Sequence, residues 1–356
     1  MPSKVQIHAV DQTPFPDQFD RLPDSLVLLI LNKVSDVRSL GHCCAVSKRF
    51  SSLVPFVQDI YLKIDRVVAG DGDGDEGLNP SSVKPSNFFC NFLKYVIFAI
   101  LRPLHHLRSA ACGYRPLLPQ LSHHSPARVL KNFGHVRNLR IELPAGDVGT
   151  EEGVLLKWRA EFGSTLQNCV ILGGTRMDRR ASESPSPAPA PEDNGSIPEA
   201  FYTDGGLKLR VVWTISSLIA ASTRHYLLRQ IIKDHPTLRS LILTDADGQG
   251  TLSMGQEQLK EFREKPLAAS ASSNRTQVPA SLLKLRYASH LLLPDGISMQ
   301  GATLVAIRPS PESGGGAAPG RKEADSFLSG AFEEPFGAAV KALFKRRIYL
   351  LEMNSF

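Results

Sequence analysis

The apolar pattern is strongest near the N-terminus, where a run of leucine, isoleucine and valine predicts a helix that starts at Pro23. Pro23 suits a first helical turn because its missing N–H needs no partner there, and Asp24 puts a negative charge at the positive end of the helix dipole. The apolar residues at helical spacing are Leu26, Leu29, Ile30 and Val34, with Val27, Leu28 and Leu31 on the other sides. One small core cannot bury all of them.

Two shorter helices are expected next. Ser35 and Asp36 offer capping oxygens for a second helix, and a third helix follows through Phe50. A unit this small hides too little of its surface to be robust alone, so either a partner or the rest of this chain must cover the first helix. The apolar pattern leaves both alternatives open.

The segment that starts at Phe19 resembles an F-box, which we place at residues 19–66. The motifs that carry the resemblance are LPD at 22–24, LLILNKV at 28–34 and AVSKRF at 45–50. Phe50 stands where many F-boxes have tryptophan. By this resemblance, some apolar residues would bind the Skp-type adaptor of a Skp-cullin-F-box (SCF) ubiquitin ligase, and burial in a three-helix core is the alternative for each of them. These residues are Leu22, Pro23, Leu26, Leu29, Ile30, Val34 and Val46.

A repeated pattern of apolar positions informs the fold of the remaining chain. One frame, apolar-x-x-apolar-x-apolar, starts at Val136, Leu166 and Leu238, and more loosely at Leu209. Intervals of roughly 30 residues, lengthened once by a proline-rich insertion, are typical of leucine-rich repeats, in which each frame supplies a strand. The alternative is an irregular α/β layer. We therefore expect an α+β or α/β fold, with a three-helix F-box followed by a leucine-rich-repeat-like or irregular α/β domain and flexible linkers.

Polar, low-complexity segments suggest where the chain divides. An apolar segment at 87–104 is interrupted by Lys94 and is shorter than the ~20 residues of a membrane span, so we expect an amphipathic helix there and no membrane span. The expected units are an N-terminal tail (1–18), the F-box (19–66), an acidic and polar linker (67–86), the amphipathic helix with a connector (87–130), a substrate-binding domain (131–308) with a disordered insert (175–204), a Gly/Pro-rich linker (309–325) and a C-terminal docking segment (326–356).

One apolar helical stripe ends at Pro236 and carries candidates for contacting a target. Trp213, Arg224 and Tyr226 are residue types that are enriched at binding hot spots. His225 lies among the apolar residues of the stripe, so we expect a hydrogen-bonded core histidine at this position, not a ligand.

Composition excludes several classes of function. The net charge of +6 over 356 residues is modest, and no dense basic and aromatic stripe of the kind that binds nucleic acid occurs. The five cysteines show no CxxC spacing, which favours reduced thiols in the cytoplasm or nucleus. The chain contains neither an HExxH motif nor a nucleophile elbow, so we expect no catalytic residues, no cofactor and no metal.

Four further segments resemble the plant auxin up-regulated F-box family: LKLRVVWTISSLIAASTRHYLLRQIIKDHP at 207–236, RNLRIEL, WRAEFGSTLQNCVIL, and ALFKRRIYLLEMNSF at 342–356. The resemblance implies a non-catalytic receptor that binds a Skp-type adaptor, and through it a cullin ligase. The receptor would present a target protein for ubiquitination, in a process tied to auxin-related growth. The target itself is not identified. A protein-interaction scaffold outside any ligase is the alternative.

Overall fold

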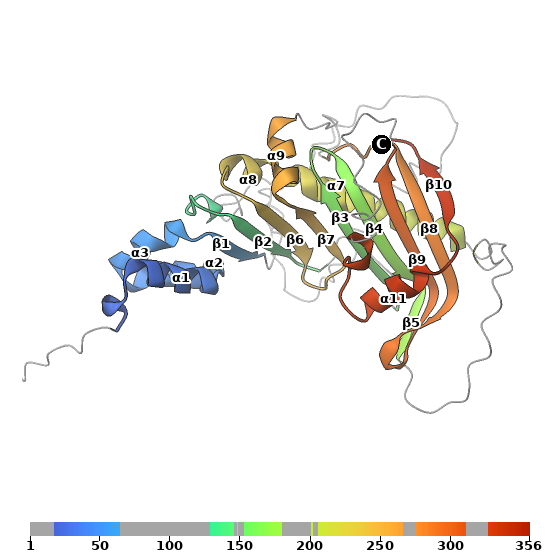
Figure 1. The fold of residues 1–356 in the computed structure, drawn as a ribbon, viewed down its shortest axis with the longest axis horizontal. Coiled ribbons are helices and arrows are strands. Elements are labelled where there is room, and N and C mark those ends of the chain that lie inside the picture. Colours follow the sequence, from blue (N-terminus) through green and yellow to red (C-terminus); the bar gives the residue numbers. More distant parts are fainter. Residues whose placement is uncertain are drawn as a thin grey trace, which may run out of the picture.

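The computed structural model describes residues 18–64, 129–145, 148, 153–179, 201, 206–265, 275–310 and 327–356 (Figure 1). The expected tail at 1–18 lies almost wholly outside these ranges. So do the expected linker at 67–86, nearly all of the helix and connector at 87–130, and most of the segments expected to be an insert and a Gly/Pro-rich linker.

Short helices form the N-terminal part of the described chain. They are η1 (Gln18–Arg21), α1 (Asp24–Val34), α2 (Val37–Val46), α3 (Lys48–Leu53) and η2 (Val54–Phe56). Two side chains cap them: Asp36 Oδ2 accepts the N–H of Ser39 at 2.9 Å to start α2, and Ser47 Oγ accepts the N–H of Phe50 at 3.1 Å to start α3. These caps satisfy N–H groups that have no partner inside the helix, and they set the sharp turns between the helices.

A ten-stranded mixed sheet forms the body of the molecule. Its strands are β1 (Asp59–Lys63), β2 (Asn138–Leu143), β3 (Leu155–Phe162), β4 (Leu166–Gly174), β5 (Arg176–Arg179), β6 (Ser240–Asp245), β7 (Gly250–Met254), β8 (Ser281–Leu292), β9 (Ile297–Pro309) and β10 (Tyr349–Met353). Their spatial order is β1-β2-β6-β7-β3-β4-β9-β8-β10, and β5 also pairs with β9. The pairs β1–β2, β2–β6 and β3–β7 are parallel, and the others are antiparallel. The sheet thus runs from the N-terminal helices to the C-terminal strand (Figure 1).

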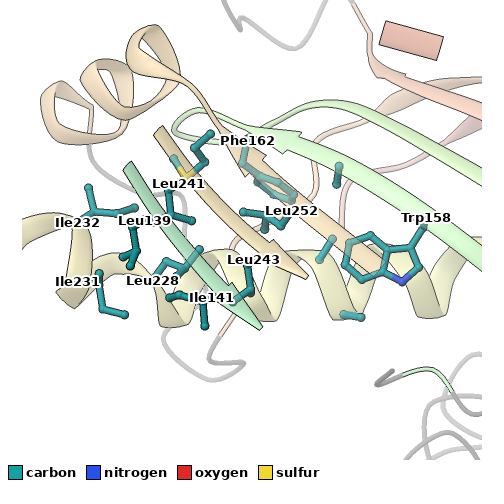
Figure 2. Close-up of a cluster of buried hydrophobic side chains, with 14 of the residues drawn as sticks. Leu139, Ile141, Trp158, Phe162, Leu228, Ile231, Ile232, Leu241, Leu243 and Leu252 are labelled. Atoms are coloured by element: carbon teal, nitrogen blue, oxygen red, sulfur yellow. The ribbon is translucent and has the colours of Figure 1, made fainter. Parts of the chain in front are cut away.

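Helices cover both faces of the sheet. α7 (Gly206–Leu227), α8 (Arg229–Asp234) and α9 (Gln256–Glu264) pack on one face, and Figure 2 shows Leu139, Leu241 and Ile232 among the side chains of that core. α11 (Phe336–Phe344) packs on the other face, against β8 and β9, and η4 (Pro294–Gly296) connects these two strands. Because successive strand residues point to opposite faces, β4 contributes Ile171 to the first core and Leu172 to the second.

The expectation of a leucine-rich-repeat stack is wrong. The frames at Val136, Leu166 and Leu238 do lead into the strands β2, β4 and β6, but the frame at Leu209 lies inside α7. β4 is also separated from β6 by β7 and β3, so the frames do not stack in sequence order. The frame at Leu209 was wrongly predicted to be a strand because apolar residues three positions apart also share one side of a helix. The observed mixed sheet corresponds to the irregular alternative.

Two expected boundaries also differ from the structure. Residues 176–179, assigned to a disordered insert, form β5, and the N–H of Thr175 donates to the carbonyl of Gln300 at 2.9 Å. Residues 59–63, assigned to the F-box, form β1 and pair in parallel with β2. Each segment pairs with a strand that lies far away in the sequence, a partner that no local pattern reveals. Among the described helices, none is both long and apolar enough to cross a membrane.

Candidate functional site

The N-terminal helices carry several exposed apolar side chains. We call this set the N-terminal apolar surface and define it by Pro23, Leu26, Leu29, Ile30 and Val46, all of which are exposed. Leu29 is 56% exposed and Val46 is 70% exposed, although both are aliphatic. Clusters of this kind on a folded protein mark interaction sites.

α1 therefore has two apolar sides with different uses. Val27 and Leu31 point inward and are almost fully buried, whereas Leu26, Leu29 and Ile30 point outward. This division answers the question that the apolar pattern left open, because the described part of the chain covers only one side of the helix.

The seven residues that resemblance assigned to adaptor binding fall into two groups. Five form the N-terminal apolar surface, and the remaining two, Leu22 and Val34, are half-buried and pack against the core. Phe19 was not on that list, yet it is 42% exposed at the start of the same helical segment. Its place at the beginning of the F-box-like sequence is the signal that could have identified it.

Arg49, the basic residue of the AVSKRF motif, holds the start of this surface in place. Its guanidinium donates to Asp24 Oδ1 from Nη2 at 2.7 Å and from Nε at 2.9 Å, and to the carbonyl of Phe19 at 2.8 Å. It also donates to the carbonyl of Leu22. The rings of Phe19 and Phe50 meet edge to face with their centres 5.6 Å apart. α3 thereby fixes the chain that leads into α1.

Hydrogen bonds and packing join the helices directly to the sheet. Asn32 Oδ1 accepts the N–H of Gln58 at 2.7 Å and that of Asp59 at 3.3 Å, and the N–H of Tyr61 donates to the carbonyl of Ser35 at 2.9 Å. The inward side chains of α1 and α2 belong to the same hydrophobic cluster as those of β1 and β2. The N-terminal apolar surface and the sheet are therefore parts of one packed body.

A shallow hollow of about 450 Å³ lies beside this junction, on the face of β1, β2 and β6. Apolar and polar side chains line it, with Ile242 and Tyr61 among them. The hydroxyl of Tyr61 donates to Glu142 Oε2 at 2.6 Å, and Lys63 pairs with Glu142 Oε1 at 3.1 Å. This hydrogen bond raises the pKa of Tyr61 and lowers the pKa of Glu142. The side chains of Tyr61, Glu142 and Lys63 therefore satisfy one another next to the hollow.

The proposed target contacts Trp213 and Arg224 are corrected by their burial. Trp213 packs its ring over Gly173, where an added Cβ would lie 2.4 Å from the indole. Arg224 is 3% exposed, pairs with Asp245 at 2.5 Å and lies over the ring of Trp158. Both side chains fill the core, so neither is placed to contact a target.

Tyr226 differs from these two residues because it is partly exposed. Its hydroxyl accepts a hydrogen bond from Arg229 at 2.5 Å, and its role in target binding stays a prediction.

His225 is a core histidine, as predicted. Its Nε2 lies 3.0 Å from the carbonyl of Gly163 and its Nδ1 lies 2.7 Å from the hydroxyl of Thr276. A neutral ring satisfies both, with Nε2 donating to the carbonyl and Nδ1 accepting from the hydroxyl. Burial lowers the pKa of His225 to about 3. The residue therefore stays neutral near pH 7.

The described residues contain no cluster of three or more His, Cys, Asp and Glu side chains that could hold a metal ion. Cys43, Cys44 and Cys169 are free thiols. The other two cysteines lie outside the described ranges.

Comparison with known proteins identifies the family. The chain is 51% identical to F-box protein At1g30200 and 37% identical to F-box protein AUF1, both of Arabidopsis thaliana. Each alignment covers 96% of this chain, and they cover 94% and 100% of the two relatives. F-box protein AUF2 of the same plant is 36% identical over 96% of the chain. No protein-family model matches the chain, and no solved structure matches it. With identities of this size over nearly its whole length, the chain belongs to the plant F-box proteins that include AUF1 and AUF2.

Proposed function

We propose that the chain is the substrate-recognition subunit of an SCF ubiquitin ligase. The N-terminal apolar surface binds a Skp-type adaptor and, through it, a cullin ligase, while the sheet and its helices present a target protein. The observation that carries the proposal is the exposure of Leu26, Leu29 and Ile30 on α1, whose opposite side is buried, together with exposed Val46 at the end of α2.

The energetics of that surface favour a protein partner. Burying a leucine or isoleucine side chain completely contributes roughly 1.5–3 kcal/mol, and α1 realises little of this for its outward residues. A complementary apolar groove on a partner would bury several of these side chains together and so gain the rest of this free energy. The clamp formed by Arg49 and the shared core fix the surface before binding, which lowers the entropy lost on association.

The chain itself has no catalytic step in this proposal. Transfer of ubiquitin requires a reactive cysteine in another subunit, and this chain contributes by placing the target at a fixed distance from the adaptor. The names of the relatives AUF1 and AUF2 support a role in auxin-related growth. The proposed location, the cytoplasm or the nucleus, is a prediction from the sequence.

Co-elution with a purified Skp-type adaptor tests adaptor binding by the N-terminal apolar surface. We expect a complex with the unaltered chain and none with the double variant Leu29→Asp, Ile30→Asp. The matched control is Ile242→Asp, which alters an exposed isoleucine on β6 that is not part of the N-terminal apolar surface. Failure of the unaltered chain to bind the adaptor would contradict the proposal, as would unchanged binding by the double variant.

Target capture tests the proposed recognition of a target protein. Affinity purification from plant cells in which the ligase is blocked is expected to recover ubiquitinated proteins with the unaltered chain and not with the double variant. A bound protein whose ubiquitination and abundance do not depend on the N-terminal apolar surface would indicate a scaffold outside the ligase.

A further inference from the structure

The two edges of the sheet are protected differently. At the β1 edge, the turn between α1 and α2 lies against the strand: Asp36 bridges to Tyr61, and the carbonyl of Ser35 accepts the N–H of Tyr61. At the opposite edge, β10 pairs with β8 and with no other described strand. Figure 1 shows β10 on the outer side of β8, far from α1. An edge strand presents backbone N–H and C=O groups that another strand can pair with.

The side chains of β10 make this edge unusual. Leu350 is 70% exposed and Leu351 is 41% exposed, and Ile348 just before the strand is exposed as well. Leu350 stands opposite Lys284 of β8, and Leu351 stands opposite Leu283, so the two leucines lie on different faces of the sheet. Soluble proteins usually protect such edges with charge, proline or a covering segment. Here the apolar residues extend both faces of the sheet outward, which suits a further strand with apolar residues on both of its sides.

The surroundings of this edge carry excess positive charge. Lys345, Arg346 and Arg347 lead into β10, with Lys345 and Arg347 exposed, and Lys284 is exposed on the neighbouring strand. Glu352 is the only acidic residue within β10. An occupant with carboxylates flanking an extended apolar core would match both features, because opposite charges across an interface favour association and discriminate between partners.

We propose that β10 recruits an extended, acidic segment of the target protein, which adds to the sheet as an extra strand. This inference rests on the proposed function, since it assigns the target end of the receptor. Main-chain hydrogen bonds would supply affinity that is independent of sequence, Leu350 and Leu351 would select apolar residues, and the basic residues before β10 would select acidic flanks.

A second copy of this chain fits the edge less well. Antiparallel pairing of two β10 strands about Leu351 would set Leu350 of one copy opposite Glu352 of the other. Such pairing would bring no acidic run to Arg346 and Arg347. The charge pattern therefore favours a different chain as the occupant.

Selection from a display library of random peptides on the full chain tests the proposal, without any adaptor. We expect enriched peptides in which apolar residues alternate and acidic residues flank them. Arg346→Glu combined with Arg347→Glu is expected to weaken their binding by about tenfold or more. Leu350→Lys combined with Leu351→Lys is expected to abolish it. The control Ile242→Lys, which alters an exposed residue on a distant strand, is expected to bind as the unaltered chain does.

Backbone hydrogen exchange supplies a readout that a merely structural change would not reproduce. A bound peptide is expected to slow exchange of the amides in 349–353, while α1 is unaffected. The variant Leu29→Asp, Ile30→Asp is expected to keep peptide binding, so failure at the adaptor end and failure at β10 are separable. Three results would overturn the inference: no enriched peptide, enriched peptides that bind the Leu350→Lys, Leu351→Lys variant equally well, or a dimer of the unaltered chain that this variant dissolves.

Discussion

A substitution at Ile60 tests whether the N-terminal helices and the sheet unfold together. Ile60 lies on β1, is 2% exposed and belongs to the hydrophobic cluster that joins α1 and α2 to β2. If the helices were a separate domain, a cavity at β1 would leave the distant part of the sheet unaffected. If they share one core, the whole body loses stability.

The structure sets the size of the effect. Ile60→Ala removes most of a fully buried side chain, which costs about 2–5 kcal/mol, because strand β2 and helices α1 and α2, which pack around it, cannot collapse into the space. For a unit of roughly 150–250 residues, each kcal/mol lowers the melting temperature by about 2–4 °C. We therefore expect a decrease of about 4–20 °C. Leu351→Ala, on the exposed edge, is the control and is expected to change stability by less than about 1 kcal/mol.

Two spectroscopic probes separate the alternatives. Both tryptophans, Trp158 on β3 and Trp213 on α7, lie in the sheet body, several strands away from β1, so their fluorescence reports that part alone. Far-ultraviolet circular dichroism reports helices throughout the chain. One shared core predicts that both transitions coincide and move together in Ile60→Ala. A tryptophan transition that stays in place while the circular dichroism transition shifts would refute the reasoning.

Three further predictions concern single side chains. The folded-state pKa of His225, about 3, lies below its unfolded value near 6.5, so its contribution to stability is complete above about pH 6.5 and is lost as the pH falls from there toward 3. Urea unfolding at pH 7 and pH 5 is therefore expected to show a loss larger by up to about 2 kcal/mol in the unaltered chain than in His225→Gln; equal losses would contradict the burial of a neutral ring. Gly173→Ala forces a Cβ against the indole of Trp213 and is expected to cost about 1–3 kcal/mol in thermal unfolding, and an unchanged melting temperature would show that the ring does not pack there. Arg49→Met releases the segment before α1 and is expected to weaken adaptor binding about tenfold in a titration; undiminished affinity would show that the clamp does not position the surface.

The residues of the N-terminal apolar surface could be predicted from the sequence, but the strands that pack beside it could not. The spacing of Leu26, Leu29 and Ile30 indicates a helix with too many apolar sides, but only the F-box resemblance suggested which side faces a partner. The pairing of β1 with β2 joins residues that are far apart in the chain, so no local pattern contains it. A receptor whose helices continue directly into its sheet could not be derived from periodicity.

The prediction that Trp213 and Arg224 contact a target was wrong for a physical reason. Arginine and tryptophan are enriched at interfaces because they are large and can form several interactions, and the same properties let them fill a core site when a partner is supplied. Arg224 has such a partner in Asp245, which lies on a neighbouring strand and is not adjacent in sequence. The exposed leucines of β10 were invisible for the opposite reason, since Leu350 and Leu351 look like core residues until the order of the strands is known.

The dissociation constant for a purified Skp-type adaptor, measured by calorimetry, tests the central claim most directly. Leu29 and Ile30 are exposed in the free chain, so Leu29→Asp with Ile30→Asp is expected to leave the melting temperature nearly unchanged. In the complex the substitution loses apolar burial and places two carboxylates in an apolar contact, which is expected to weaken binding by about a thousandfold or more, or roughly 4 kcal/mol. Wild-type affinity in this folded variant, with Ile242→Asp behaving identically, would contradict the assignment of the N-terminal apolar surface to the adaptor.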